Sequence, residues 1–441
     1  MGRLFGTDGI RGEVGSDVTA ELSLVLGRAV GHRFGGTARS VVLGRDTRRS
    51  GEMLGAALAA GLMSTGTDVL DLGVVTTPCL VHASLSHAAG IMVSASHNPA
   101  VDNGLKVVVG GRKAGDDDEA DLERLMADPS PVLSRPNAEL GRLRTVTGPV
   151  ESYRRHLVEA AGQALRGLRI AIDCANGSAS GIAPDLLRSL GAEVTVLFAS
   201  PDGTNINEAC GSTHPERLAQ TVADAGLDLG LALDGDADRL IAADERGNLV
   251  DGDAIMGICA LARLADGSLR NSVLVATVMS NGGLERAVTD AGGRMIRTPV
   301  GDRHVLEAME REDATLGGEQ SGHIIFRDRA TTGDGLLTAI ELARAMQEAG
   351  KPLSALAAGI PKLPQVVINS VVRRRDDWRD DPDFSAAVDR ATADIGDRGR
   401  ILVRPSGTEP KIRIMVEGDD AAEIDRIARE LATLADARFN R

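Results

Sequence analysis

The pattern that most constrains the fold of this chain occurs three times in succession: short apolar segments alternate with amphipathic segments of helical period. Such alternation is typical of βαβ units, in which parallel strands form a sheet and the intervening helices cover its faces. We therefore predict three consecutive α/β domains with mixed, mainly parallel sheets. The strands are expected at 41–43, at 69–72 and up to Ser96, then at 168–173, 194–197 and 227–233, and then at 273–276 and 295–296, with the segment 315–322 ending the third unit.

The last part of the chain follows a different pattern. After two prolines at 361 and 364 come a strand at 366–368, a helix at 386–394, two strands around a loop within 401–416, and a closing helix at 421–435. This order predicts a smaller α+β domain. A helix that includes 153–157 would connect the first two domains. We therefore expect four domains around a central cleft, at 1–150, 151–251, 252–362 and 363–441.

The composition restricts the compartment and the partners of the protein. The four cysteines show no Cys-x-x-Cys spacing, which argues against a zinc site or a disulfide framework and fits a reducing cytoplasm. A net charge of −14 disfavours nucleic acid and anionic membranes as partners. Without a signal peptide or a bilayer-spanning apolar run, we expect a cytoplasmic protein, either monomer or homodimer. The acidic run at 116–119 is expected to be a solvated loop.

A serine and a histidine follow the apolar segment at 89–93, in the order Ser94-Ala95-Ser96-His97-Asn98-Pro99. Pro99 cannot continue a strand, so a hydroxyl and an imidazole are left at the carboxyl end of a predicted strand, where open α/β sheets place their ligand sites. Ser96 could carry a covalent group there and pass it on. An ordinary polar turn is the alternative interpretation of this segment.

Three carboxylates, Asp234, Asp236 and Asp238, follow the apolar segment at 227–233. So much negative charge in a tight loop is costly unless a hard divalent cation binds it. The spacing resembles a calcium-binding EF-hand loop, but Arg239 stands where that loop needs glycine, and the flanking segments are predicted strands rather than helices. Magnesium leaves positions open for phosphate oxygens, so a phosphorylated Ser96 could share one centre with these carboxylates.

Two further loops carry polar side chains. The glycine-rich segment at 317–323 contains Glu319 and Ser321, which could bind sugar hydroxyls, and His323 close by; a plain turn is the alternative. Arg404 begins a segment at 404–411 whose charged, hydroxyl and backbone donors suit a phosphate cradle, with a chance β-turn as the alternative. No Walker A motif occurs. We expect Arg11, Lys106, Arg239 and Arg404 to lie in motif loops that face one cleft.

Together these motifs resemble the α-D-phosphohexomutase superfamily over nearly the whole chain, and its amino-sugar branch in particular. The segments that carry the finer match are 5–12 (FGTDGIRG), 210–215 (CGSTHP), 300–303 (VGDR) and 318–323 (GEQSGH). Gln320 stands where relatives that act on mannose or glucose phosphates typically have methionine. His304 departs from the tyrosine that is usual at its position.

The resemblance implies a role for each matched residue. It implies that Ser96 is a phosphoserine and that one Mg²⁺ per chain is held by Asp234, Asp236, Asp238 and the Ser96 phosphate. It implies that Arg11, His97, Lys106, Arg239 and His323 surround the transferring group and share acid and base duty. It implies substrate contacts from Asp302, Arg303, Glu319 and Ser321, and binding of the non-reacting phosphate by Arg404, Ser406, Gly407 and Thr408.

The activity that the resemblance implies is the interconversion of glucosamine 6-phosphate and glucosamine 1-phosphate through a 1,6-bisphosphate, for UDP-N-acetylglucosamine and cell-wall precursor synthesis. A hexose 1,6-bisphosphate would act as activator, and domain closure would exclude water from the transfer. Three alternatives remain open at this point: a mutase for glucose or mannose phosphates, a metal-dependent sugar phosphatase, and a non-enzymatic sensor of ions or sugar phosphates.

Overall fold

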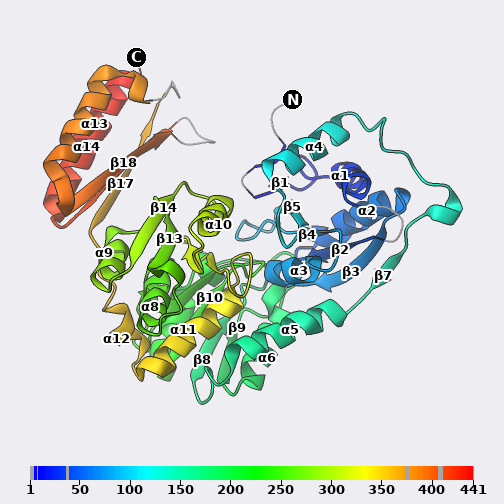
Figure 1. The fold of residues 1–441 in the computed structure, drawn as a ribbon, viewed down its shortest axis with the longest axis horizontal. Helices are drawn as coiled ribbons and strands as arrows, with labels where there is room; N and C mark the ends of the chain where they lie inside the picture. The colour runs from blue at the N-terminus through cyan, green and yellow to red at the C-terminus, as the bar shows by residue number, and fades with distance from the viewer. Residues whose placement is uncertain (1–3, 7, 36–38, 373–377, 406–410, 441) are drawn as a thin grey trace.

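The computed structural model describes residues 4–6, 8–35, 39–372, 378–405 and 411–440, and it places them in four domains, each built on its own sheet (Figure 1). Domains I to III each combine a parallel centre with antiparallel strands at an edge, and domain IV is antiparallel throughout. These mixed α/β sheets and the smaller last domain confirm the predicted fold class. In the described part of the chain, every helix is too short or too polar to span a membrane.

Domain I orders its strands β1-β5-β4-β2-β3-β7, with β6 paired to β5. Its central strand β4 is buried along its whole length, because helices cover both faces of the sheet. The strands are β1 (Ile10–Glu13), β2 (Ser40–Arg45), β3 (Asp68–Val74), β4 (Ala89–Val93), β5 (Asp102–Val109), β6 (Arg112–Lys113) and β7 (Leu143–Thr145). The helices are α1 (Ala20–Arg33), α2 (Ser50–Ser64), α3 (Thr77–Ser84) and α4 (Asp116–Ala127).

Helix α5 (Gly148–Ala161) connects domain I to domain II, as the sequence predicts. Domain II orders its strands β12-β11-β10-β8-β9. Its elements are β8 (Arg169–Asp173), α6 (Ala183–Ser189), β9 (Glu193–Leu197), α7 (Glu216–Ala225), β10 (Leu229–Leu233), β11 (Leu240–Ala243) and β12 (Leu249–Val250). Strand β10 is apolar and fully buried, and the segment with three aspartates begins directly at its carboxyl end.

Domain III orders its strands β14-β13-β15-β16, and domain IV β17-β19-β18. Domain III contains α8 (Gly252–Ala265), β13 (Val273–Thr277), α9 (Gly282–Asp290), β14 (Arg294–Thr298), α10 (Asp302–Arg311), β15 (Leu316–Gly318), β16 (Ile324–Phe326), α11 (Gly335–Ala349) and α12 (Leu353–Ala357). Domain IV contains β17 (Gln365–Val371), α13 (Pro382–Ile395), β18 (Gly399–Pro405), β19 (Lys411–Gly418) and α14 (Ala421–Phe439).

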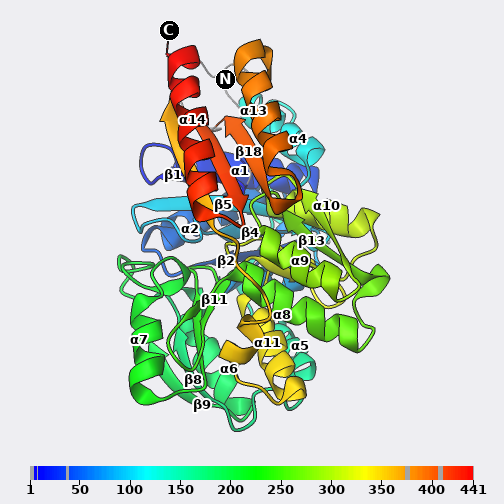
Figure 2. The same cartoon turned by 90° about the vertical axis from the view of Figure 1, so that its left-hand side faces the viewer.

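The apolar cores explain how the domains are joined. One continuous cluster of buried side chains runs from Leu80 in domain I through Tyr153 and Leu157 of α5 into the cores of domains II and III. Domain IV has a core of its own, centred on Phe384. Domains I to III are therefore packed as one body, whereas domain IV stands at the other end of the molecule across from domain I (Figures 1 and 2).

Polar contacts fasten domain IV to domain III. The Arg400 guanidinium donates to the carbonyl oxygens of Val278 (2.6 Å) and Ser280 (2.5 Å). The buried Glu417 carboxylate accepts from the Gly282 N–H at 2.8 Å and from Arg400 Nε at 2.9 Å. Since a few hydrogen bonds rather than a shared core hold this contact, domain IV is the part of the molecule best able to rotate.

Three expectations about local structure are wrong. Strand β4 ends at Val93 rather than Ser96, because the Ser94 side chain accepts from the Ser96 N–H and closes a turn. The acidic run at 116–119 forms the first turn of α4 instead of a loop, where negative charge is favoured by the helix dipole. Arg11, Lys106 and Arg404 lie in strands β1, β5 and β18 rather than in loops.

Candidate active site

Ser96 occupies a strained turn directly after β4. Its φ of +51° lies in the left-handed region, which is uncommon for a residue other than glycine. The Ser96 N–H donates to the Ser94 hydroxyl at 3.0 Å, and this hydroxyl donates to the buried Asp46 carboxylate at 2.6 Å. Only 1% of Ser96 is exposed. Within domain I, these hydrogen bonds shape the turn and leave the Ser96 hydroxyl free to reach domain II.

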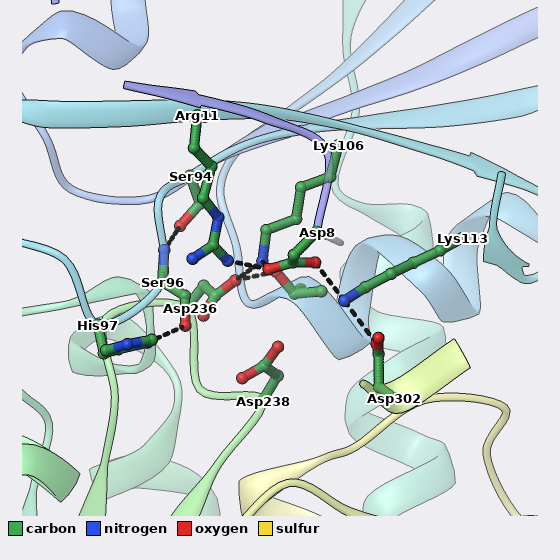
Figure 3. Close-up of polar contacts among 12 residues, drawn as sticks. Asp8, Arg11, Ser94, Ser96, His97, Lys106, Lys113, Asp236, Asp238 and Asp302 are labelled. Carbon is green, nitrogen blue, oxygen red and sulfur yellow. Dashed lines mark hydrogen bonds and ion pairs between the residues drawn. The ribbon is translucent and has the colours of Figure 1, made fainter. Parts of the chain in front are cut away.

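The aspartates of domain II meet this turn. Ser96 Oγ donates to an oxygen of Asp234, and Asp236 lies beside them (Figure 3). Asp236 Oδ2 accepts from the Thr77 hydroxyl at 2.6 Å and from Lys106 Nζ at 2.7 Å, both in domain I. Ser96 and the aspartates thus follow the carboxyl ends of parallel strands in two domains whose strand ends face each other.

The aspartates fit a divalent cation. Asp234, Asp236 and Asp238 each offer a carboxylate oxygen, and these oxygens lie within 4.8 Å of one another. All three side chains are buried, and Asp236 Oδ1 and Asp238 Oδ1 have no hydrogen-bond partner among the described residues. Burial and the neighbouring charges of Asp238 and Asp236 hold the pKa of Asp234 well above its usual range. Hard oxygen ligands in this arrangement suit Mg²⁺.

Cationic side chains surround the aspartates. Lys106 is buried beside Asp236, and burial, opposed by the Asp236 charge, lowers the pKa of Lys106. Burial likewise lowers the pKa of Arg11. The Nε atoms of Arg11 and Arg239 are buried and have no hydrogen-bond partner among the described residues, although Arg239 Nε lies 3.9 Å from Asp238 Oδ1. Such desolvated donors beside unpartnered carboxylate oxygens indicate that the site accommodates an anion together with a cation.

Asp8 organises these cations from the side of β1. Its carboxylate pairs with Arg11, with Lys113 and, at 3.2 Å, with Lys106 Nζ (Figure 3). Lys113 also pairs with Asp302 of domain III at 2.5 Å. Because one carboxylate contacts three cations, Asp8 keeps them close together in spite of their mutual repulsion.

Two histidines complete the cluster. His97 Nδ1 lies 3.4 Å from Ser96 Oγ, and burial, with the charges of Arg239 and Arg11, lowers the pKa of His97 to about 4. His97 is therefore neutral at pH 7. His323 Nε2 accepts from the backbone N–H of Gly333 at 3.0 Å, so in the neutral ring the proton lies on Nδ1, which faces Asp238 at 3.5 Å.

The expected sugar-binding residues lie in domain III. Glu319 follows β15 and accepts from the Gly301 N–H at 2.9 Å, and the Ser321 hydroxyl donates to Glu319 at 3.5 Å. Arg303, which we expect to contact substrate, forms interdomain contacts in this structure. Its guanidinium donates to Glu119 at 2.7 Å and to the Ala114 carbonyl at 2.7 Å. In this structure Arg303 therefore joins domain III to domain I.

Arg404 lies in domain IV, on β18. It lines a hollow of about 270 Å³ between the domain IV sheet and Met279 of domain III. Arg413 stands opposite Arg404 on the neighbouring strand, and Arg413 Nε is buried without a partner among the described residues. Burial, then the Arg413 charge, lowers the pKa of Arg404. Ser406, Gly407 and Thr408 lie outside the described residues.

Sequence reasoning missed several residues of this cleft. Asp8 belongs to the segment 5–12 that we singled out, so its proximity to Arg11 was a usable signal. Arg413 lies just beyond the polar segment 404–411, where polar and apolar residues alternate as they do in a strand. This alternation was a weaker signal. Nothing local marks Lys113 or Thr77, because only tertiary packing brings them to the aspartates.

Comparisons with known proteins agree with this architecture. Family models described as Phosphoglucomutase/phosphomannomutase, alpha/beta/alpha domains I, II and III match residues 2–131, 151–247 and 251–363, and the C-terminal domain model matches 367–434. A phosphoglucosamine mutase of Symbiobacterium thermophilum is 51% identical, covering 98% of each chain. One of Moorella thermoacetica is 49% identical, covering 99% of each chain. The solved structure of a phosphoglucomutase/phosphomannomutase family protein from Burkholderia thailandensis has a TM-score of 0.85 at 29% identity, covering 99% of this chain and 98% of that chain.

Proposed function

The chain belongs to the phosphoglucomutase/phosphomannomutase family, and from that premise we propose that it is a phosphoglucosamine mutase, an isomerase that interconverts glucosamine 6-phosphate and glucosamine 1-phosphate. The curated relatives that bear this name are about half identical to it over nearly the full chain. We propose domain boundaries at 1–150, 151–251, 252–362 and 363–441. In this division domain I bears the phosphoserine, domain II binds the metal, domain III recognises the sugar and domain IV binds phosphate.

One observation carries the proposal. The Ser96 hydroxyl and the three aspartates converge at one buried place. There, Asp236 Oδ1, Asp238 Oδ1 and the Nε atoms of Arg11 and Arg239 have no hydrogen-bond partner among the described residues. A nucleophilic oxygen, a cation site and an anion site are what phosphoryl transfer needs, since its catalysis is mostly positioning and charge neutralisation.

In the first half-reaction the phosphoryl group passes from phosphorylated Ser96 to the C1 hydroxyl of glucosamine 6-phosphate. The bond between phosphorus and Ser96 Oγ breaks, a bond to the C1 oxygen forms, the C1 hydroxyl proton moves to a base, and Oγ takes up a proton. After the 1,6-bisphosphate has turned around, Ser96 Oγ attacks its 6-phosphate. Ser96 is then phosphorylated again, and glucosamine 1-phosphate leaves. A hexose 1,6-bisphosphate would prime or restore the phosphoserine as activator.

The chain supplies groups for each part of this transfer. Magnesium held by Asp234, Asp236 and Asp238, one ion per chain, would leave a position for a phosphate oxygen and withdraw its charge. Arg11, Lys106 and Arg239 would neutralise the remaining oxygens. The Asp234 carboxylate accepts a hydrogen bond from the Ser96 hydroxyl, and His97 lies within reach as a neutral imidazole, so both are placed to exchange the hydroxyl proton. His323, whose Nδ1 faces Asp238, would share in the acid and base duty.

Domains III and IV would hold the sugar phosphate in either orientation. We propose that Glu319 and Ser321 bind sugar hydroxyls, and that Asp302 and Arg303 contribute when domains III and I adjust around substrate. Arg404, with Ser406, Gly407 and Thr408, would bind the phosphate that is not reacting. Arg413 adds a second positive charge to that hollow. Rotation of domain IV would close the cleft and exclude water.

The test compares sugars. Purified protein with Mg²⁺ and glucose 1,6-bisphosphate is expected to isomerise glucosamine 6-phosphate with a kcat/KM at least about tenfold above that for glucose or mannose 6-phosphate. A preference for either of the latter would make the protein a phosphomannomutase/phosphoglucomutase. Release of inorganic phosphate without isomerisation would indicate a sugar phosphatase, and binding without turnover a sensor.

Replacing Arg404 tests the phosphate hollow. The change Arg404→Ala removes charge-assisted hydrogen bonds of about 1.5–3 kcal/mol each, so we expect KM for the sugar phosphate to rise by about 10- to 100-fold. Steady-state kinetics with glucosamine 6-phosphate would measure this. Arg426→Ala, on the exposed face of α14 where Arg426 pairs with Glu430, serves as the control and should leave KM unchanged. An unchanged KM in Arg404→Ala would remove this residue from phosphate binding.

A further inference from the structure

The backbone around Ser96 is strained on both sides of the contact between domains I and II. Besides Ser96, the non-glycine residues with left-handed φ include a group in domain II: Ala175, Asn176, Phe198, Asn207, Ala209 and Ala237. Unfavourable backbone conformations of this kind persist only where surrounding contacts hold them. The contacts that hold Ser96 therefore indicate which residues control the direction of its hydroxyl.

Arg48 holds the Ser96 turn from within domain I. It is 2% exposed, and its guanidinium pairs with Asp46 at 3.0 Å. Its remaining donors reach the carbonyl oxygens of the turn: that of Ser96 at 3.0 Å, that of Asn98 at 2.8 Å, and those of Pro99 and Asp102. One buried guanidinium thus binds four carbonyl groups of the segment 96–102 in a fixed fork geometry.

Asn207 holds the same turn from domain II. Its Nδ2 atom donates to the Ser96 carbonyl at 2.9 Å and to the Asn98 carbonyl at 3.0 Å. Asn207 is 9% exposed with φ +59°, and its own N–H donates to the Ala175 carbonyl at 2.9 Å. Gly235 closes the third side, because a Cβ there would lie 2.6 Å from the Ser96 carbonyl oxygen.

We propose that Asn207 and Arg48 are positioning residues that keep Ser96 Oγ directed at the aspartates in both half-reactions. Neither side chain contacts the reacting oxygen; both act on the carbonyls behind it. Because Asn207 and the aspartates belong to domain II while Ser96 belongs to domain I, the Asn207 amide also fixes the distance between them, together with the contacts of Thr77 and Lys106 to Asp236. The inference rests on the proposed role of Ser96 as the phosphoryl carrier.

Two substitutions of Asn207 test this role. Asn207→Gly removes the amide and still tolerates the left-handed backbone, and Asn207→Asp keeps the shape but turns a donor into an acceptor facing two carbonyls. We expect kcat to fall by about 10- to 100-fold in both, because small errors in the position of a reacting group have effects of this size. KM for glucosamine 6-phosphate should stay within about threefold, since the sugar phosphate is bound elsewhere.

Asn205→Ala is the matched control. Asn205 lies in the same segment of domain II, two residues before Asn207, and its side-chain amide bonds to Ser200 and Asp202 of that segment. It should keep kcat within about twofold of the wild type, and its thermal midpoint measures the stability lost when an amide of this segment is removed without touching the Ser96 turn. The proposal would be overturned if kcat and thermal midpoint fell together in the Asn207 variants in the same proportion as in Asn205→Ala.

A second measurement separates this inference from the proposed function. Dephosphorylated protein is mixed with glucose 1,6-bisphosphate, and the appearance of the phosphate mass on Ser96 is followed by intact-mass spectrometry. We expect this single transfer to slow by the same factor as kcat. Wild-type rates in both Asn207 variants, with Ser96→Ala inactive, would overturn the positioning role alone. Wild-type isomerisation by Ser96→Ala would instead overturn the proposed role of Ser96 as the phosphoryl carrier.

The double variant Asn207→Gly with Arg48→Lys examines whether the two side chains act on the same carbonyls. Lysine keeps the charge beside Asp46 but cannot bind several carbonyls in a fork. If both residues position Ser96 through these shared acceptors, the combined loss in kcat should be smaller than the product of the single losses. Independent, fully multiplicative losses would contradict a common mode of action.

Discussion

Replacing Ser96 by alanine is expected to lower mutase activity by at least about 10³-fold, because the enzyme loses the oxygen that carries the phosphoryl group between the two ends of the sugar. The same change should abolish the phosphate-sized mass increment of the purified protein. Coupled assay of glucosamine 1-phosphate formation and intact-mass spectrometry measure the two effects. An active Ser96→Ala protein would exclude a phosphoserine mechanism.

A second serine provides a control for the fold. Ser272 also has a left-handed φ, of +53°, and it directly precedes β13. It therefore lies at the amino end of this strand, whereas Glu319 follows the carboxyl end of the parallel strand β15. Ser272→Ala therefore imposes the same backbone and side-chain change outside the site. It should leave the activity unchanged, and its effect on the free energy of unfolding shows how much of any loss in Ser96→Ala comes from folding.

Neutralising Asp234 is expected to remove both metal binding and activity, the latter by on the order of 10²-fold or more. In the wild type, Mg²⁺ at a hundred times its Kd should raise the free energy of unfolding by about 2.7 kcal/mol, because it binds only the folded state. In Asp234→Asn most of this stabilisation should disappear. Thermal unfolding with Mg²⁺ and with EDTA would show it without an activity assay.

The structure also predicts whether Asp234→Asn stabilises or destabilises the protein in the absence of metal. Burial and two neighbouring carboxylates raise the pKa of Asp234, so its ionised form is unfavourable in the folded protein at neutral pH. Metal-free Asp234→Asn should therefore unfold at a temperature equal to or above that of the metal-free wild type. A lower midpoint would show that protein contacts alone stabilise the ionised Asp234 carboxylate, without a bound cation.

Asp228→Asn is the matched control for this experiment. Asp228 directly precedes β10, as Asp234 directly follows it, and it pairs with Arg169 at 3.0 Å. The substitution therefore removes one carboxylate at the opposite end of the same strand. It should keep the full stabilisation by Mg²⁺ and the full activity, and a loss here would mean that β10 rather than the carboxylates responds to the change.

Much of the architecture could be predicted from the sequence because its signals are local. The apolar segments that became β4 and β10 are recognisable from a few neighbouring residues, and both are buried as fully as expected. Ser96 and Asp234 stand at the carboxyl ends of these strands, where a general rule for α/β sheets places ligands. Helices such as α1 and α8 were missed, because small residues make their apolar face hard to separate from a loop.

Local secondary structure was less predictable where a motif combined glycine and charge. Arg11 and Lys106 were expected in loops because glycines flank them, yet β1 pairs with β5 and both cations extend from strands. Antiparallel pairing between residues 10 and 105 cannot be inferred from either segment alone. The error did not change which cationic residues were identified. It did change how rigidly they were expected to be held, because a sheet holds side chains more firmly than loops would.

The sequence by itself determined the four-domain order and the chemical groups available, namely a serine, three aspartates and several arginines and lysines. Only the tertiary structure decided which of them meet: that Thr77 and Lys106 reach Asp236, that Asp8 gathers three cations, and that Asn207 binds the Ser96 turn. The reason is physical. Strand and helix periods are set by neighbours a few residues away, whereas a contact such as that between Asn207 and Ser96, 111 positions apart, depends on how whole domains pack.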